Sequence, residues 1–322
     1  MGRILVTGGA GFIGSHLCAT LLRQGHAVVC LDNFNSYYDP RVKRSNIESF
    51  LLDPDFQLFE KDILDLRFLR ELFAEMNFEV VVHLAARAGV RPSIQEPLLY
   101  QQVNVEGTNN LLEVSKEANI KKFIFASSSS VYGKNEKIPF HETDSVDNPI
   151  SPYAATKKAG ELICYTYHHL YQLPCTCLRF FTVYGPRQRP DMAIHKFTRA
   201  IFRDEEISMY GDGSSERDYT YITDIIDGIC RSIESCSAYH IYNLGESKTI
   251  KLRDLINLIA RNLDKVPKIK RLPWQPGDVP ITYADISHPR NEIGYSPKIG
   301  IEEGVKKFVQ WYTELEVGCS VS

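Results

Sequence analysis

The sequence predicts an α/β protein with a doubly wound parallel sheet and a second, smaller lobe of mixed α/β structure. Short apolar runs alternate along the first half of the chain with segments of helical period. The runs of strand length are RILVTGG at 3–9, HAVVCLD at 26–32, FQLFEKD at 56–62, VVVHLAA at 80–86, KKFIFAS at 121–127 and CTCLRFF at 175–181. Apolar strands that alternate with helices indicate a parallel sheet covered on both faces.

The second lobe is predicted from a change in composition after residue 180. The loops there are rich in Pro, Gly and charge: YGPRQRPDM at 184–192, YGDGSSERD at 210–218 and LPWQPGDV at 272–279. A chain of 322 residues also exceeds the ~250–300 residues at which single cores stop growing. We expect a first domain at 1–180 and a lobe formed mainly by 181–322, from which strands or helices can return to the first domain. Such a lobe should lie over the carboxyl ends of the sheet.

Charge and cysteine usage narrow the class of ligand and the compartment. The formal net charge is −3 without a dense Lys/Arg run, so we expect a small-molecule ligand and neither nucleic acid nor a membrane surface. The eight cysteines form no CxxC pair, which is typical of reduced thiols in the cytoplasm. No apolar stretch reaches the ~20 residues of a membrane span, and we expect no signal peptide. The nine histidines lack metal-ligand spacing, so no metal is expected and His83 is interpreted as a core residue.

The first chemical motif is GGAGFIG at 8–14, between the first strand and the helix predicted at 15–25. Gly8, Gly11 and Gly14 let the backbone turn tightly and approach a pyrophosphate at the positive end of the helix. Asp32 ends the second strand about 20 residues further on, where a carboxylate accepts hydrogen bonds from ribose hydroxyls. Because it would repel a 2′-phosphate, the motif predicts NAD rather than NADP. The alternative is that these glycines are ordinary turn residues and Asp32 a helix cap.

The ends of the third and fourth strands add to this site. Asp62 and the pair Ala85–Ala86 stand where the adenine and the middle of the cofactor would lie, although alanines after a strand are also common in cores. With their chain neighbours, the predicted cofactor residues are Gly8, Gly11, Phe12, Ile13, Gly14, Asp32, Asn33, Asp62, Ile63, Leu84, Ala85, Ala86, Tyr153 and Lys157.

The catalytic candidates are SSSSVYG at 127–133 and SPYAATK at 151–157. Serines at the end of an apolar strand can simply cap the next turn, or can form the rim of an active site. Tyr153 and Lys157 lie four residues apart and share one face of a helix. An ammonium and a positively charged nicotinamide beside the phenol would lower its pKa from ~10 toward that of a general base.

In this order GGAGFIG, Asp32, SSSSVYG and YAATK resemble the extended short-chain dehydrogenase/reductase family, in its sugar-nucleotide branch, over essentially the whole chain. The resemblance implies a Rossmann-type fold with Ser128 as catalytic hydroxyl, Tyr153 as base and Lys157 on the nicotinamide ribose. The segments 100–117 and 153–171 resemble the helices that pair relatives into homodimers.

The residues before VYG indicate the reaction. Dehydratases and UDP-glucuronate decarboxylases of this family resemble each other in having an acidic residue there, whereas this chain has Ser129 and Ser130. Epimerisation needs only the Tyr, a Ser or Thr and a cofactor that takes and returns a hydride. The resemblance therefore favours an epimerase over a dehydratase or decarboxylase.

The substrate is indicated by finer resemblance. The segments 32–47, 83–97 and 180–197 resemble UDP-glucuronate 4-epimerases more than UDP-glucose 4-epimerases. A hexuronate carboxylate needs hydroxyl donors and a cation, for which the candidates are Ser129, Ser130, Thr182, Arg189 and Arg91. A UDP-glucose or UDP-N-acetylhexosamine 4-epimerase and a non-catalytic NAD-binding sensor are the alternatives.

The UDP half of the substrate is assigned to the second lobe. By the same resemblance, Arg217 matches the position that binds the diphosphate and Asp278 the one that contacts the nucleotide ribose. Many relatives have Arg where this chain has Gln275, so the second diphosphate cation is left unassigned.

Overall fold

The structure is a computed structural model that describes residues 2–274 and 279–319. Its main sheet has seven parallel strands in the order β10-β6-β5-β4-β1-β2-β3. The strands are β1 (Arg3–Thr7), β2 (Ala27–Asp32), β3 (Phe56–Glu60), β4 (Phe78–His83), β5 (Lys122–Ser128), β6 (Cys175–Phe180) and β10 (Tyr239–Leu244). The predicted doubly wound parallel sheet is confirmed, and β10 extends it by a strand that was not predicted.

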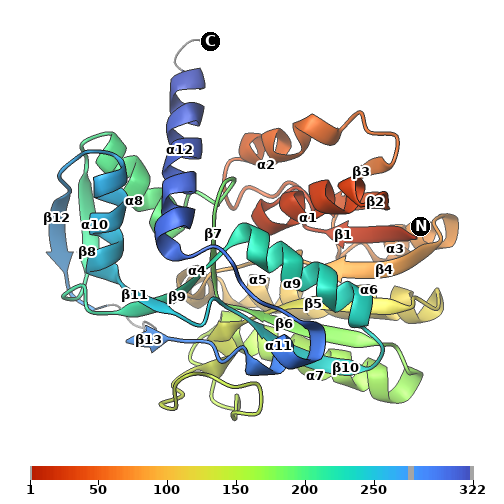
Figure 1. Ribbon diagram of the computed structural model, residues 1–322. Coiled ribbons are helices and arrows are strands. Elements are labelled where there is room, and N and C mark those ends of the chain that lie inside the picture. Colours follow the sequence, from red (N-terminus) through yellow and green to blue (C-terminus); the bar gives the residue numbers. More distant parts are fainter. Residues whose placement is uncertain (1, 275–278, 320–322) are drawn as a thin grey trace.

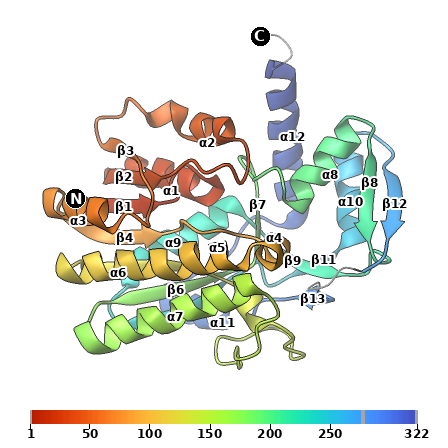
Figure 2. The ribbon, with the colours of Figure 1, turned by 180° about the vertical axis from the view of Figure 1, so that it is seen from behind.

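Helices cover both faces of this sheet (Figures 1 and 2). One face packs against α3 (Leu66–Glu75), α6 (Gly107–Glu117) and α7 (Pro152–Tyr171), and the other against α1 (Phe12–Arg23) and α9 (Ile222–Ser235). Neighbouring residues of a strand point to opposite faces, so Ile4 and Val6 enter one core while Leu5 enters the other. This two-sided burial explains why the strands are almost continuously apolar.

The order of the strands creates a crevice at the carboxyl end of the sheet. From β1 the chain continues through α1 to β2 on one side, and β4 pairs with β1 on the other side. The connections after neighbouring strands therefore diverge on opposite faces of the sheet, which is where open α/β folds bind ligands.

Shorter elements connect the strands around this crevice. They are α2 (Pro40–Ile47), the 3₁₀ turns η1 (Glu48–Phe50) and η3 (Ser129–Tyr132), α4 (Val90–Gln95), α5 (Pro97–Gln101) and the π-helical turn η2 (Gln102–Glu106), which runs directly into α6.

A second group of elements lies beside the carboxyl ends of the main strands (Figure 1). Its strands are β7 (Thr182–Tyr184), β9 (Glu216–Tyr221), β11 (Thr249–Lys251) and β13 (Ile281–Thr282) in one sheet, and β8 (Glu206–Tyr210) and β12 (Lys268–Leu272) in another. Its helices are α8 (Ala193–Phe202), α10 (Leu252–Asn262) and α12 (Ile301–Cys319), whereas α11 (Ser287–Ile293) packs against α9 and β10 at the edge of the main sheet. The division at residues 180 and 181 remains a prediction, since the chain returns to the main sheet through α9 and β10.

Within residues 2–274 and 279–319, every helix is too short or too polar to cross a bilayer.

Candidate active site

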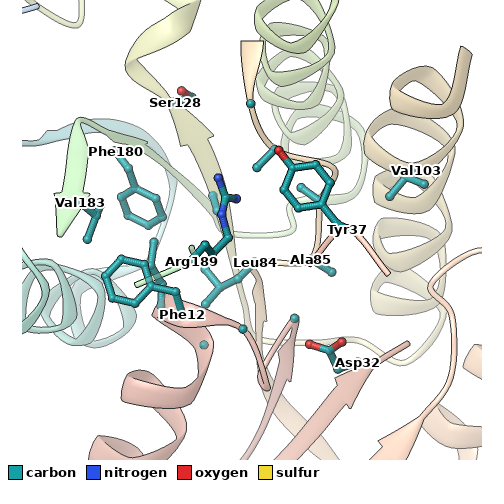
Figure 3. Close-up of a pocket in the computed structure, with 18 of the residues that line it drawn as sticks. Phe12, Asp32, Tyr37, Leu84, Ala85, Val103, Ser128, Phe180, Val183 and Arg189 are labelled. Atoms are coloured by element: carbon teal, nitrogen blue, oxygen red, sulfur yellow. The ribbon is translucent and has the colours of Figure 1, made fainter. Parts of the chain in front are cut away.

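A cavity of about 360 Å³ opens at the carboxyl ends of β1, β2, β4 and β5 (Figure 3). Every residue predicted for the cofactor lines it, and so do Ser128–Ser130, Thr182 and Arg189. The fold therefore brings together in one cavity residues that are far apart in the chain.

The glycine-rich loop forms one wall of the cavity. Gly8 has a φ of 68°, and a Cβ atom there would lie 2.8 Å from the backbone nitrogen of Ala85. A Cβ on Gly14 would lie 2.2 Å from the carbonyl oxygen of Gly8, so neither position accepts a larger residue in this conformation. Gly11 precedes α1 without a capping side chain, which leaves the first N–H groups of the helix for an anionic ligand such as a pyrophosphate.

Asp32 lies at the end of β2 with its carboxylate held by three neighbours. It accepts hydrogen bonds from the backbone N–H groups of Ala10 at 3.2 Å and Phe34 at 2.9 Å. Lys43 Nζ lies 3.8 Å from Oδ1. Burial raises the pKa of Asp32, and the Lys43 charge opposes that shift. Sequence reasoning missed Lys43, because a lysine inside the polar segment RVKRS gives no sign of being buried.

His83 is a core residue, as interpreted from the sequence. The Thr108 hydroxyl donates to the carbonyl of Asn104 and so accepts from His83 Nε2 at 3.0 Å, which leaves Nδ1 to accept from Thr7 Oγ1 at 2.8 Å. Burial lowers the pKa of His83 to about 3, so the imidazole is neutral and both nitrogens are paired. Thr7 in turn accepts from the N–H of Ala85 at the wall of the cavity.

Ser128, Tyr153 and Lys157 meet where β5 and α7 pack together. Ser128 Oγ donates to Ser130 Oγ at 3.1 Å and lies close enough to the Tyr153 phenol to oppose the rise of its pKa. Lys157 is buried and donates from Nζ to the carbonyl of Ala126 at 2.6 Å. Burial lowers the pKa of Lys157 to about 8.

The pKa of Tyr153 differs from the sequence-based expectation. Burial raises it, while the Ser128 hydroxyl and the charge of Arg189 oppose the rise. The expected lowering relied on the Lys157 ammonium beside a charged nicotinamide. In the structure, Lys157 bonds to the β5 backbone, and Arg189 is the cation that acts on the phenol.

The first serine of the run has a different partner. Ser127 Oγ donates to Glu161 Oε1 at 2.6 Å, and Glu161 forms a two-pronged ion pair with Arg179 at 2.8 and 2.9 Å. Both charged side chains are almost completely buried. All four serines line the cavity, but the hydroxyl of Ser127 is bound to Glu161 and so ties β5 to α7 and β6.

Arg189 projects into the cavity between Ser128 and Tyr37 (Figure 3). Its Nε and Nη2 donate to the two Asp191 oxygens at 3.1 Å each. Its Cζ lies 5.4 Å from the centre of the Tyr37 ring. One edge of the guanidinium is therefore taken by Asp191, and the Nη1–Nη2 edge is the one left for a carboxylate.

A second cavity of about 530 Å³ lies between α8, β8, β9 and α10, and Arg91 and Arg217 line it. The Arg91 guanidinium lies over the ring of Tyr210 at 4.8 Å, so Arg91 belongs to this cavity and does not line the first. Asp191 lines the second cavity and its partner Arg189 the first, so the two cavities adjoin there. Asp278 and Gln275 lie outside the described residues.

Several lining residues were not predicted as site residues. Besides Lys43 they include Asn35, Tyr37, Tyr38, Gly89, Val103 and Met192. The segment 32–47 was used for its resemblance to relatives and for Asp32 and Asn33, and its two adjacent tyrosines were the signal that could have pointed to further lining residues. Among residues 2–274 and 279–319, no group of His, Cys, Asp or Glu side chains could hold a metal ion.

Comparison with known proteins agrees with these features. Residues 5–308 match the family described as GDP-mannose 4,6 dehydratase. The chain is 45% identical to UDP-glucuronate 4-epimerase 1 of Arabidopsis thaliana, over 96% of this chain and 76% of that protein. It is 43% identical to UDP-glucuronate 4-epimerase of Thermodesulfobacterium geofontis, over 98% and 97%.

A solved structure shares the architecture. UDP-glucuronic acid 4-epimerase from Bacillus cereus, in complex with UDP-glucuronic acid and NAD, superposes with a TM-score of 0.92 at 37% identity, covering 97% of this chain and 99% of that one. The predicted resemblance is thereby confirmed. The chain belongs to the GDP-mannose 4,6 dehydratase family, within the extended short-chain dehydrogenases/reductases.

Proposed function

We propose that this protein is a UDP-glucuronate 4-epimerase, which interconverts UDP-glucuronate and UDP-galacturonate by transient oxidation at carbon 4. One observation carries the proposal: a single cavity joins Tyr153 and Ser128 with donors suited to a carboxylate, namely Ser129, Ser130, Thr182 and Arg189. The relatives named above as UDP-glucuronate 4-epimerases support the same substrate.

NAD fits the first cavity. The glycine loop leaves room where side chains would clash, the start of α1 offers free N–H groups, and Asp32 is placed to accept from ribose hydroxyls. We assign NAD binding to these residues, with Lys157 on the nicotinamide ribose. When bound, NAD supplies the acceptor for the hydride of carbon 4 and the donor that returns it.

Two side chains of the protein, Tyr153 and Ser128, carry out the proton transfer. Tyr153 takes the proton of the hydroxyl group on carbon 4, and Ser128 hydrogen-bonds to the reacting oxygen and the phenol. Burial raises the Tyr153 pKa, and the positive charge of a bound nicotinamide would lower it toward the range of a general base. The 4-keto sugar then turns over, so that the hydride returns to its opposite face.

The carboxylate must be restrained during this turn. The 4-keto intermediate is a β-keto acid, which loses carbon dioxide when the bond to its carboxylate aligns with the carbonyl π system. Arg189 and the hydroxyls of Ser129, Ser130 and Thr182 hold the carboxylate away from that alignment. We assign the UDP half to the second cavity, with Arg217 at the diphosphate.

Substrate preference tests the proposal directly. The purified protein is expected to convert UDP-glucuronate to UDP-galacturonate faster than it converts UDP-glucose or UDP-N-acetylglucosamine. This activity should need no added NAD, because the returned hydride leaves the bound NAD unchanged. Product formation is followed by NMR for each sugar separately. Faster turnover of UDP-glucose would contradict the assignment of UDP-glucuronate as substrate. A rate that increases with added NADP but not with added NAD would contradict the assignment of NAD as cofactor.

Replacing Arg189 by alanine is expected to slow epimerisation at least about tenfold and to raise the share of turnovers that end in carbon dioxide. A charge-assisted contact contributes about 1.5–3 kcal/mol, and ~1.4 kcal/mol is tenfold in a rate. Arg189→Lys should be intermediate, because a point charge does not reproduce the fork. NMR of UDP-glucuronate incubations measures both products.

The matched control is Arg187→Ala, two residues away in the same loop, where the side chain lines a different cavity with His16 and Arg23. It should leave the ratio of the two products unchanged. Unchanged epimerisation in Arg189→Ala would remove Arg189 from the site. If epimerisation in Arg189→Ala is slower but no decarboxylated product forms, Arg189 binds the substrate without restraining its carboxylate.

We also propose a cytoplasmic homodimer. Large apolar side chains are exposed on α5 and α7, with Leu98 84%, Leu162 55% and Tyr165 50% exposed, which supports pairing through these helices. The seven cysteines whose side chains are described are free thiols, which suits a reducing compartment. A monomer mass by light scattering would contradict the dimer.

A further inference from the structure

The segment 33–39 crosses the first cavity between β2 and α2, and its two tyrosines have different partners. The Tyr38 ring lies below Lys43, whose Nζ is 5.1 Å from the ring centre. The Tyr37 ring lies within cation–π distance of two guanidinium groups, at 5.8 Å from Arg87 and 5.4 Å from Arg189. The rings of these two neighbours in sequence thus lie against different cations.

Tyr37 is fixed at its hydroxyl end as well. A Cβ on Gly89, which has a φ of 99°, would lie 2.9 Å from the Tyr37 hydroxyl oxygen, so the phenol fills the space that this glycine leaves. The Tyr100 phenol lies close enough to that of Tyr37 to affect its pKa. Tyr100 donates to the carbonyl of Ala88 at 2.6 Å, and its ring lies edge-on to Tyr153 at 6.2 Å. Tyr37 and Tyr100 therefore lie one after the other between the Arg189 guanidinium and the Tyr153 phenol.

The position of Arg189 depends on two contacts that differ in direction. Asp191 holds the Nε–Nη2 edge and itself lines the second cavity. Tyr37 supports the face of the guanidinium inside the first cavity, where Figure 3 shows the two side chains together. If the Tyr37 ring is removed, only the ion pair with Asp191 remains of these two contacts. Because Asp191 lines the second cavity, that ion pair holds Arg189 from the side of the second cavity.

We propose that Tyr37 is a positioning residue that keeps the Nη1–Nη2 edge of Arg189 on the substrate carboxylate, and thereby decides whether the 4-keto intermediate is epimerised or decarboxylated. This rests on the proposed function. When the restraint fails, the bond between carbons 5 and 6 breaks and its electron pair forms an enolate across carbons 4 and 5. Carbon dioxide leaves, carbon 5 takes a proton from water, and the hydride removed from carbon 4 stays on the cofactor.

This balance gives two independent readouts. Each decarboxylation yields one UDP-4-keto-pentose and leaves one reduced cofactor, whereas each epimerisation returns the cofactor to NAD. The ratio of keto-pentose to UDP-galacturonate is measured by NMR, and reduced cofactor by its absorbance. A residue with a purely structural role would lower both products together and leave their ratio unchanged.

The test compares Tyr37→Leu, Tyr37→Phe and the neighbouring Tyr38→Leu with wild type. Tyr37→Leu is expected to raise the ratio of decarboxylation to epimerisation about 2- to 30-fold, the range of a cation–π contact from exposed to desolvated. Tyr37→Phe keeps the ring and should return the ratio to near the wild-type value. Tyr38→Leu removes a ring that packs on Lys43, the partner of Asp32, and should leave the ratio as in wild type while it alters the amount of NAD retained.

A double variant tests whether the effect passes through Arg189. In an Arg189→Ala background, adding Tyr37→Leu should cause no further change in the ratio. An unchanged ratio in Tyr37→Leu, an equal change in Tyr38→Leu, or a full additional effect without the guanidinium would each overturn the inference. If Tyr37→Leu does not fold, Tyr37→Met is measured against the same expectations. Failure of the proposed function would be seen differently, as a wild-type protein that does not epimerise UDP-glucuronate.

Discussion

Replacing Tyr153 by phenylalanine is expected to lower the rate of UDP-glucuronate epimerisation by about 10²- to 10⁴-fold, the contribution of general acid–base catalysis. The change removes the hydroxyl to which we assign the exchange of the substrate proton, and on which Ser128 acts. The ring that lies edge-on to Tyr100 is kept, so the fold and the retained NAD should be as in wild type. Initial rates of UDP-galacturonate formation, with cofactor content measured on the same sample, provide the test.

Tyr165→Phe is the matched control for this variant. Tyr165 lies on the same helix α7 and is half-exposed, so loss of its hydroxyl should leave the rate as in wild type. A Tyr153→Phe rate within tenfold of wild type would rule out the phenol as the base. Such a result would direct attention to Ser128 or to a water molecule in its place.

Replacing Arg179 by methionine is expected to lower the free energy of unfolding by about 3–5 kcal/mol, the cost of leaving a buried charge without its partner. Glu161 accepts from Ser127 and twice from Arg179, and its side chain is wholly buried. Lys158 Nζ, 3.6 Å away, is the closest remaining cation. The change is measured as a lower urea midpoint at an unchanged slope.

Two further variants separate burial from charge. Arg67→Met breaks an exposed pair with Glu71, whose side chains are 90% and 58% exposed, and pairs of this kind often contribute nothing measurable. A double variant Glu161→Leu/Arg179→Met removes both buried charges and should recover much of the lost stability. If Arg67→Met and Arg179→Met lower the free energy of unfolding by the same amount, the buried pair contributes no more to stability than the exposed one.

The sequence predicted what depends on local pattern. Each of the six predicted strands is apolar over its own length, and the glycine spacing before α1 requires only its neighbours. β10 escaped prediction because its sequence, YHIYNL, mixes polar and apolar residues and becomes a strand by pairing with β6 more than 50 residues earlier. β10 is therefore a strand because it pairs with β6, and its own sequence does not show this.

The residues missed at the site have a related explanation. Burial of Lys43 and the contacts of Tyr37 are set by loops that meet only after folding, and nothing in NSYYDPRVK fixes which way those side chains point. Helical spacing placed Lys157 near the phenol but could not show that its ammonium bonds to Ala126, or that burial raises the Tyr153 pKa. Arg179, inside the apolar run CTCLRFF, was a visible sign of a buried partner.

The return of the chain to the main sheet through α9 and β10 limits how such a protein can exchange parts with its relatives. A single genetic crossover after residue 180 would carry over the donor's edge strand and covering helix together with its second cavity, and these must then pair with the recipient's β6 and pack beside its α1. Transfer of the second cavity alone requires at least two inserted segments, one before residue 222 and one after residue 244. Recombination should therefore succeed mainly between parents whose β6 and β10 already match, so new substrate preferences in this architecture arise more readily from changes in single loops than from the exchange of a whole lobe.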